Sequence, residues 1–291
     1  MSQKSTHLEN MRCIFYMIIA MAGFAIEDAI IKQLSNSMPI SEILILIGIG
    51  GLVIFSLAAR YWAIRILSAE IKNPRFLIRS LCELAAAISF VTAIVHGSLS
   101  VSSAIIQATP LAVVIGGTFI LKQQVSGLSW VLVLTGFIGV LMVTQPGLEG
   151  FKPATLFAVA AVFFLAIRDI ITRSISDSIP VITISFWAFF ASLFAGLITV
   201  PFFESFQIPS SKDALLLTSS VCTASLAYCA VVLATRSGEI SVVAPFRYSR
   251  LLFAIVLSVV FFDESINSLM ILGSALIAIS GVMMLAVTQR Q

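Results

Sequence analysis

The feature that most constrains this chain is a succession of apolar stretches, each long enough to cross a membrane as a helix. A bilayer core about 30 Å thick needs roughly 20 apolar residues in helical conformation. Only 11% of the residues are charged, whereas a soluble domain carries about 25%. The sequence therefore predicts an all-α membrane protein with ten transmembrane helices. The predicted spans are residues 12–33, 39–59, 75–95, 101–121, 127–144, 154–173, 180–200, 213–235, 241–262 and 268–288.

The basic residues indicate which side the termini occupy. An even number of spans places both termini on one side, and the loops of the other side would hold Lys32, Lys152 and Lys212. Because basic residues concentrate in cytoplasmic loops, we expect a multi-pass protein of the cell inner membrane with both termini in the cytoplasm. The cytoplasmic side would hold Lys4, Arg12, Arg60, Arg65, Lys72, Arg75, Lys122, Arg173, Arg236 and Arg290.

The two halves of the chain repeat each other. A shift of 142 positions places Glu27 on Asp169 and Lys122 on Glu264. Each half then holds five spans, and an odd number of spans turns the second half upside down relative to the first. We therefore predict two inverted five-helix repeats with a site at their interface. The predicted repeats are residues 11–145 and 152–288.

Two similar stretches, one in each half, resemble a known family. The first is Gly97-Ser98-Leu99-Ser100-Val101-Ser102-Ser103-Ala104, followed by Pro110 and Leu121-Lys122-Gln123. The second is Gly238-Glu239-Ile240-Ser241, followed by Ala244-Pro245-Phe246-Arg247-Tyr248-Ser249-Arg250 and Phe262-Asp263-Glu264. With the five-plus-five plan, the chain resembles the drug/metabolite transporter superfamily in its ten-span form with two EamA-type repeats. That family often has an acidic residue where Lys122 stands, so the first repeat departs from the pattern there.

The resemblance implies a function and an architecture. It implies a central cavity lined by spans one to four and six to nine, with spans five and ten at the periphery. The run from Arg247 to Arg250 looks most like bacterial carriers that include riboflavin importers and S-adenosylmethionine carriers. A small-molecule substrate and the lipid bilayer are therefore the expected partners, a homodimer is left open, and no basic patch suggests nucleic acid.

Charged residues inside the predicted spans are candidate functional residues, because charge is costly in hydrocarbon. Arg79 and Glu83 are spaced to pair on one helix face. Three basic residues near the cytoplasmic boundary, Arg79, Arg168 and Arg247, fit structural salt bridges or snorkelling toward water better than a binding role. The full set is Glu27, Asp28, Arg79, Glu83, Arg168, Asp169, Arg247 and Arg250.

Arg250 and Glu83 lie near mid-depth, where a binding role is favoured. A guanidinium there can hold a carbonyl, carboxylate or phosphate oxygen through two parallel hydrogen bonds. We expect Arg250, with Arg247 nearby, to bind substrate. Glu83 would balance Arg250 while the site is empty and release it when substrate arrives.

Three further acids are candidates for charge balance or proton coupling. Glu27 and Asp28 lie in the outer part of span one, and Asp169 lies at the equivalent inverted place on span six. A carboxylate in a low-dielectric cavity holds a proton more readily than one in water. Adjacent residues on a helix diverge by about 100°, so one acid of span one would line the cavity while the other pairs with Lys32. Facilitated diffusion is the alternative to coupling.

Aromatic residues could line a site for a flat ring. Tyr228 and Ser225 share a face of span eight, and Tyr248, Phe24, Phe90 and Trp187 could complete the lining. Most of the 22 phenylalanines must instead face lipid or packing neighbours, so the tyrosines, whose hydroxyls need partners in a membrane, are the stronger candidates.

Prolines and glycines shape the predicted helices. Pro110 and Pro245 would kink spans four and nine and free the carbonyls of Ile106 and Ser241. Such bends could act as gates or could only shape the packing. Small residues allow close helix contact, and we expect this of Gly48, Gly50, Gly51, Gly116, Gly117, Gly136 and Gly139.

The sequence therefore predicts a secondary carrier of a small polar metabolite, with riboflavin uptake as the leading function. The alternative is a carrier of S-adenosylmethionine or amino acids, in either direction. A rival from another class is an intramembrane enzyme using Glu27, Asp28 and Asp169, but acids spread over two repeats suit alternating access better. No cofactor or metal is expected, because the sequence lacks a phosphate-binding loop and its histidines and cysteines lack metal-ligand spacing.

Overall fold

The computed structural model describes residues 7–66, 73–120, 127–145, 152–172, 179–200, 207–237 and 244–288. Within these ranges the chain forms helices and no strand. The first half contains α1 (His7–Leu34), α2 (Ile40–Tyr61), α3 (Pro74–His96), α4 (Leu99–Ile106), α5 (Thr109–Ile120) and α6 (Gly127–Thr144). The second half contains α7 (Thr155–Thr172), α8 (Val181–Thr199), α9 (Ser211–Ser237), the 3₁₀ helix η3 (Ala244–Tyr248), α11 (Ser249–Phe262) and α12 (Ser268–Thr288).

The helices confirm the all-α fold with ten transmembrane spans. Eight of the predicted spans correspond to single helices in the structure. The other two are interrupted: span four consists of α4 and α5, and span nine consists of η3 followed by α11. These interruptions occupy equivalent places in the two halves, at the spans in which the sequence predicts proline kinks.

Local sequence explains where several helices begin. Pro39 precedes α2 and Pro180 precedes α8, both in extended backbone that cannot continue a helix backwards. At the start of α3, the side chain of Asn73 accepts a hydrogen bond of 2.9 Å from the backbone N–H of Arg75. Pro74 occupies the first helical position, where a missing N–H costs least. Proline thus marks the start of all three helices, and at α3 a side-chain cap also satisfies one of the first backbone N–H groups.

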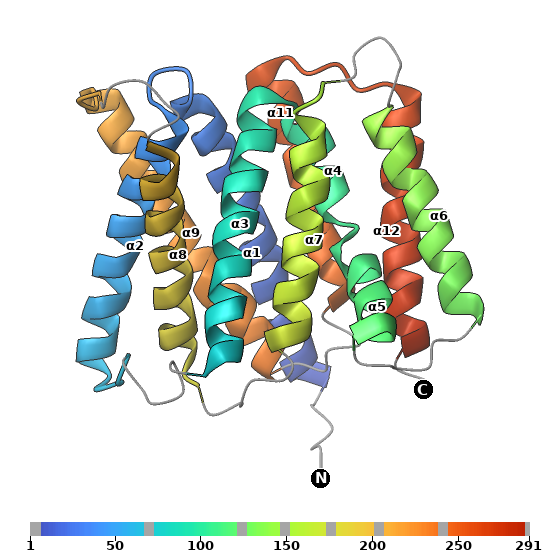
Figure 1. The fold of residues 1–291 in the computed structure, drawn as a ribbon, viewed down its shortest axis with the longest axis horizontal. Helices are drawn as coiled ribbons and strands as arrows, with labels where there is room; N and C mark the ends of the chain where they lie inside the picture. Colours follow the sequence, from blue (N-terminus) through green and yellow to red (C-terminus); the bar gives the residue numbers. More distant parts are fainter. Residues whose placement is uncertain are drawn as a thin grey trace.

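The two halves pack against each other in a pattern that a two-fold relation requires. Helix α1 packs along α9, and its repeat-equivalent, α7, packs along α3, the equivalent of α9. Two further pairs, α2 with α8 and α6 with α12, are each made of two equivalent elements, and the contact of α1 with α11 is matched by that of their equivalents, α7 and α5. Two repeats related by a two-fold axis in the membrane plane would make these contacts. Figure 1 shows α6 and α12 together at the right-hand edge of the bundle, as expected for peripheral spans.

Apolar side chains cover the outside of the bundle, as in a protein surrounded by lipid. Large side chains such as Leu57, Phe163, Leu226 and Leu252 are exposed on α2, α7, α9 and α11. Five described helices, α1, α2, α3, α8 and α9, are individually long and apolar enough to cross a bilayer. Shorter apolar helices fill most of the other spans. The membrane embedding predicted from hydropathy thus agrees with the surface of the folded chain.

Glycines allow the closest helix contacts, as the sequence predicts. A Cβ atom placed on Gly139 of α6 would lie 2.7 Å from the carbonyl oxygen of Gly273 in α12. A Cβ atom on Gly48 of α2 would lie 2.6 Å from the backbone nitrogen of Leu193 in α8. Side chains at these positions would force the backbones apart, so the glycines set the separation of both helix pairs.

Candidate functional site

A buried ion pair joins the two repeats in the interior of the bundle. Arg250, near the start of α11, donates hydrogen bonds of 2.6 and 3.2 Å to one carboxylate oxygen of Asp28 in α1. The side chain of Asp28 is 6% exposed and that of Arg250 is 19% exposed. Because both charges are held away from water, each depends on the other for stabilisation.

Two phenylalanine rings flank the guanidinium of Arg250. The Cζ atom of Arg250 lies 5.4 Å from the ring centroid of Phe24 and 5.3 Å from that of Phe90. Phe24 is one turn before Asp28 on the same face of α1, and Phe90 comes from α3. Both distances are within the range of cation–π attraction. Arg250 is therefore held by one carboxylate and one aromatic ring from α1 and by a second aromatic ring from α3.

A second polar cluster surrounds Glu83 of α3. Its carboxylate accepts bonds from Arg79 at 3.4 Å, Arg168 at 2.9 Å and the hydroxyl of Tyr228 at 3.3 Å. Arg168 also bonds to its neighbour Asp169 at 2.8 Å. The expected pair of Arg79 with Glu83 is therefore present, within a larger network that links α3, α7 and α9. Phe24, whose ring contacts that of Tyr228 edge-on at 5.7 Å between centroids, lies between this cluster and Arg250.

Other polar side chains of the predicted site have no hydrogen-bond partner among the described residues. Glu27 is half-buried on α1 and makes no hydrogen bond or ion pair there. The hydroxyl of Ser225 in α9 is buried without a partner. Both groups can therefore bind a ligand without first giving up a hydrogen bond to the described part of the chain.

The two interrupted spans meet at Gln107. This buried residue lies between α4 and α5, and its side-chain amide donates a 3.0 Å hydrogen bond to the backbone carbonyl of Arg247 in η3. The carbonyl of Ile106, which Pro110 was expected to free, accepts a 2.6 Å bond from the hydroxyl of Thr109. The carbonyl of Ser241 lies outside the described residues. Pro245 is part of η3, so both predicted kinks fall at helix interruptions.

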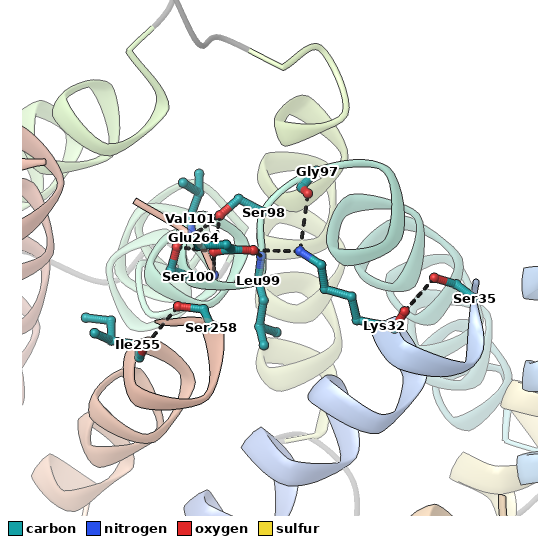
Figure 2. Close-up of polar contacts among 10 residues, drawn as sticks. All are labelled: Lys32, Ser35, Gly97, Ser98, Leu99, Ser100, Val101, Ile255, Ser258 and Glu264. Atoms are coloured by element: carbon teal, nitrogen blue, oxygen red, sulfur yellow. Dashed lines mark hydrogen bonds and ion pairs between the residues drawn. The ribbon is translucent and has the colours of Figure 1, made fainter. Parts of the chain in front are cut away.

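A third polar cluster lies where α1, α3 and α11 end and α4 begins (Figure 2). The carboxylate of Glu264, just after α11, accepts bonds of 2.6 Å from Lys32 and 2.7 Å from the backbone N–H of Leu99. The hydroxyls of Ser98 and Ser100 each donate a 2.6 Å bond to it, and the backbone N–H of Ser100 adds one of 3.1 Å. Glu264 therefore accepts five hydrogen bonds, four of them from the start of α4.

The surroundings of Glu264 keep its carboxyl group ionised. Burial by itself would raise its pKa, but the hydrogen bonds from Lys32, Ser100 and Ser98 and the charge of Lys32 lower the pKa from 4.5 to about 2. A carboxylate that accepts several hydrogen bonds is stabilised in its charged form. The hydrogen bonds around Glu264 therefore favour its charged form at neutral pH.

The structure corrects three of the expected pairings. Arg250 pairs with Asp28 and not with Glu83. Lys32 pairs with Glu264 and not with Asp28. Tyr248 does not join Tyr228: its hydroxyl lies against Gly281 of α12 and has no hydrogen-bond partner among the described residues. Sequence spacing identifies pairs within one helix, whereas these partners come from different helices.

Sequence reasoning also missed several residues. Glu42, three residues inside the second predicted span, is 1% exposed and accepts a 3.0 Å bond from the backbone N–H of Gln207. Because Glu42 lies within an apolar stretch, it belonged among the charged residues inside the predicted spans, but it was not included in that set. The roles of Gln107 and Glu264 depend on contacts between the repeats, which no local pattern announces. Trp187 packs edge-on against Phe76 and Phe190, away from the aromatic rings around Arg250.

Comparison with known sequences identifies a family. The sequence pattern of the EamA-like transporter family matches residues 11–145 and again residues 152–286. A solved crystal structure matches 98% of this chain and 99% of its own chain with a TM-score of 0.67. Since its sequence identity is 14%, that likeness concerns the fold alone.

Individual relatives match only part of the chain and at modest sequence identity. A riboflavin transporter of Vibrio cholerae serotype O1 is 29% identical over 181 residues, which are 61% of this chain and 59% of the relative. An S-adenosylmethionine uptake transporter of Rickettsia conorii is 26% identical over 156 residues, covering 53% and 52%. A riboflavin transporter of Rhizobium johnstonii is 25% identical over 177 residues, covering 60% and 57%. The chain thus spans less than two thirds of the length of these relatives.

Proposed function

Since this chain belongs to the EamA-like transporter family, we propose that it carries a flat, polar heterocycle of the riboflavin type into the cell across the bacterial inner membrane. In the proposed orientation both termini are cytoplasmic. Substrate would bind between the repeats at Arg250 and Asp28. The proposal rests on one arrangement above all: a buried guanidinium that both a carboxylate and two aromatic rings contact.

This arrangement suits a ring that carries both donors and acceptors on one edge. The pyrimidine edge of a flavin presents two carbonyl oxygens on either side of an N–H group. Arg250 would donate to a carbonyl oxygen, and Asp28 would accept from the N–H. Stacking on Phe24 or Phe90 would add about 1–3 kcal/mol, on the scale measured for nucleobases against aromatic side chains. When the ligand binds, its carbonyl oxygen and N–H group would therefore take over the hydrogen bonds that Arg250 and Asp28 make to each other in the empty site.

We propose that the Glu83 cluster lines the part of the substrate's path that lies beyond Phe24 from Arg250. Arg79 and Arg168 are paired there with Glu83 and Asp169, so their charges need no substrate to balance them. Tyr228 links this cluster to the ring of Phe24. We assign Tyr228 and Ser225 to the wall of the binding site, and Glu83, Asp169 and Arg79 to charge balance within the closed bundle.

A second candidate substrate is a zwitterionic metabolite such as S-adenosylmethionine. The observation that favours it is the carboxylate of Glu27, which lies next to Asp28 and has no partner among the described residues. Arg250 would then hold the substrate carboxylate, while Glu27 would face its positive charge. The names of the relatives support both substrates, so the experiment below includes both.

The rival reading as an intramembrane enzyme has less support. Asp28 and Asp169, two of its three acids, are each bound to an arginine in a separate cluster. Among the described residues, no three histidines, cysteines or acids are grouped to hold a metal ion. Family membership and the two-fold packing both favour transport.

Uptake of labelled riboflavin tests the proposal. The protein is expressed in a riboflavin-requiring bacterium that lacks its own importer, and saturable uptake is expected, which excess unlabelled riboflavin abolishes. Arg250→Ala should lose uptake even when uptake is divided by the amount of protein in the membrane. Arg60→Ala, which removes an exposed arginine at the end of α2, is the matched control and should transport normally.

The same cells distinguish the substrates. Unlabelled S-adenosylmethionine or amino acids that compete with riboflavin would indicate a broader site. Uptake of labelled S-adenosylmethionine without uptake of riboflavin would replace the first substrate by the second. Wild-type uptake by Arg250→Ala would remove Arg250 from the binding site.

A further inference from the structure

The Glu264 cluster connects parts of the chain that must separate if this end of the bundle opens. Lys32 is in the last turn of α1, Ser98 and Ser100 are at the start of α4, and Glu264 follows α11. The first two elements belong to one repeat and the third to the other. Figure 2 shows the carboxylate between the tip of Lys32 and the start of α4. A single side chain thus closes a three-way junction between the repeats.

The Glu264 junction and the Asp28–Arg250 pair both link α1 to α11 or the residues just after it. In the ion pair α1 supplies the acid, whereas in the junction α1 supplies the base. On α1, Phe24, Asp28 and Lys32 follow one another at intervals of four residues and therefore share one face. On the partner side, Arg250 is basic near the start of α11, and Glu264 is acidic just after its end. Asp28 holds Arg250 and Lys32 holds Glu264. Any large displacement of α11 from α1 must break both contacts, starting with the one at the rim.

Glu264 is well placed to keep this end closed. Its side chain is 12% exposed, and it accepts bonds from two backbone N–H groups at the start of α4, where the helix dipole favours a negative charge. Lys32 is additionally held over the ring of Phe262, 5.0 Å from its centroid, and bonds to the carbonyl of Gly97 at 3.4 Å. The adjacent Asp263 is exposed and has no such contacts among the described residues.

We infer that Glu264, held by Lys32 and the start of α4, is the latch that closes the end of the carrier opposite the start of α1 and the end of α12. This inference rests on the proposed transport function, in whose orientation that end is the outer one. The latch holds the closed state while the Asp28–Arg250 pair is shielded. Opening requires the Glu264 carboxylate to leave the start of α4 and Lys32 and to enter water. Weakening the latch therefore increases the fraction of molecules that are open at this end.

A cysteine introduced at a buried position close to the Glu264 latch can measure the fraction of molecules that are open at this end. Ser103, one turn further along α4 than Ser100, is fully buried, and its hydroxyl has no hydrogen-bond partner among the described residues. Ser103→Cys is made in a chain whose four cysteines are replaced by alanine. The protein is placed in lipid nanodiscs, and the rate of reaction with a charged, water-soluble maleimide is measured. Neither a substrate nor a known membrane orientation is needed.

Loss of the latch should speed this labelling. Glu264→Gln, which keeps the size of the side chain, is expected to raise the rate about tenfold, the change that about 1.4 kcal/mol of lost closing energy produces. Lys32→Met should change the rate in the same direction. Asp263→Asn is the matched control, because it neutralises the neighbouring exposed acid, in a left-handed conformation that asparagine tolerates; it should label like the parent.

A second thiol distinguishes opening from general loosening. Cys13 is buried near the start of α1, at the opposite end of that helix, and a chain that keeps it as its single cysteine reports on the rest of the fold. Faster labelling at Ser103→Cys with unchanged labelling at Cys13 supports the latch. Unchanged labelling at Ser103→Cys in both Glu264→Gln and Lys32→Met overturns it, and so does an equal rise at Cys13. Failure of riboflavin uptake would refute the proposed substrate without altering this result.

Discussion

At the residue scale, the Asp28–Arg250 pair shows how this chain keeps charge inside a membrane. Each side chain is the other's ion-pair partner, while Glu83 is occupied by Arg79, Arg168 and Tyr228, and Lys32 is occupied by Glu264. Removing one member of a buried pair leaves an uncompensated charge, which costs about 3–5 kcal/mol, whereas replacing both by neutral groups is often tolerated. The pair can therefore be tested for structural and binding roles separately.

The double variant Asp28→Asn/Arg250→Gln makes that separation. We expect each single variant to accumulate less in the membrane and to melt at a lower temperature than the wild type. The double variant should recover both, because it leaves no unpaired charge, yet it should remain unable to take up substrate. Membrane abundance, thermal unfolding in detergent and uptake are measured on all three proteins. A double variant that transports at the wild-type rate would reduce the pair to a structural contact.

Glu264 should make the protein's stability depend on pH in a defined range. Its pKa is lowered in the folded chain from 4.5 to about 2, so its contribution is fully present above about pH 4.5 and is lost as the pH falls toward 2. The groups that face it are Lys32, the hydroxyls of Ser98 and Ser100, and the first N–H groups of α4. The shift corresponds to about 3 kcal/mol at neutral pH.

Thermal unfolding of the wild type and of Glu264→Gln, recorded between pH 7 and pH 2, measures this contribution. The wild type should unfold at a higher temperature at pH 7, with a constant difference down to about pH 4.5. The difference should then shrink, because the protonated glutamic acid resembles the glutamine. A difference that stays constant down to pH 2 would mean that folding does not lower the pKa of Glu264.

At the element scale, the two interrupted spans act as one unit. Spans four and nine are equivalent in the repeats, and both break near mid-course, where Gln107 joins the end of α4 to the backbone of η3. The accepting carbonyl belongs to Arg247, three residues before Arg250. The hydrogen bond therefore positions the turn from which the candidate binding residue extends, although Gln107 itself is not assigned to the substrate.

The substitution Gln107→Leu tests whether this hydrogen bond positions Arg250 for transport. Leucine has a similar size but cannot donate, so the hydrogen bond from residue 107 to the carbonyl of Arg247 is lost, at a cost of about 1 kcal/mol. We expect the KM for uptake to rise about tenfold with the membrane level nearly unchanged. Gln33→Leu, the same substitution at a residue of α1 with no side-chain hydrogen bond among the described residues, is the control. Equal KM values for the two variants would show that the bridge between the breaks is dispensable.

At the scale of the whole molecule, the inverted repeats give the bundle two ends with different contacts. The end where α1 begins and α12 ends lies opposite the end where α1 finishes and α4 starts (Figure 1), and Glu264 contacts both of these elements there. The cluster of Glu83, Arg168 and Asp169 joins α3 to α7, and the equivalent pair is α9 with α1. There, Glu27 stands where α7 has Asp169, and no ion pair forms among the described residues. The two repeats thus share a fold but place their charged residues differently, which allows the two ends of the bundle to differ in how readily they open.

What the sequence by itself determined is the set of helices and their order. Segments of about 20 apolar residues and proline at helix starts depend on local composition, so ten spans could be read from residues close together in the chain. The inverted halves and the family pattern followed from comparing one half of the sequence with the other. The pair of Arg79 with Glu83 belongs to the same class, because a spacing of four residues decides it.

Only the tertiary structure decided the partners of the remaining buried charges. The sequence placed Glu83 near mid-depth with Arg250 and therefore favoured that pair, whereas the fold pairs Arg250 with Asp28. Lys32 was matched to Asp28 within α1, yet it reaches Glu264 from the other repeat. Such pairs join residues more than 200 positions apart, and their choice depends on helix rotation and crossing. Those quantities follow from the packing of all ten spans together, which no single segment of the sequence contains.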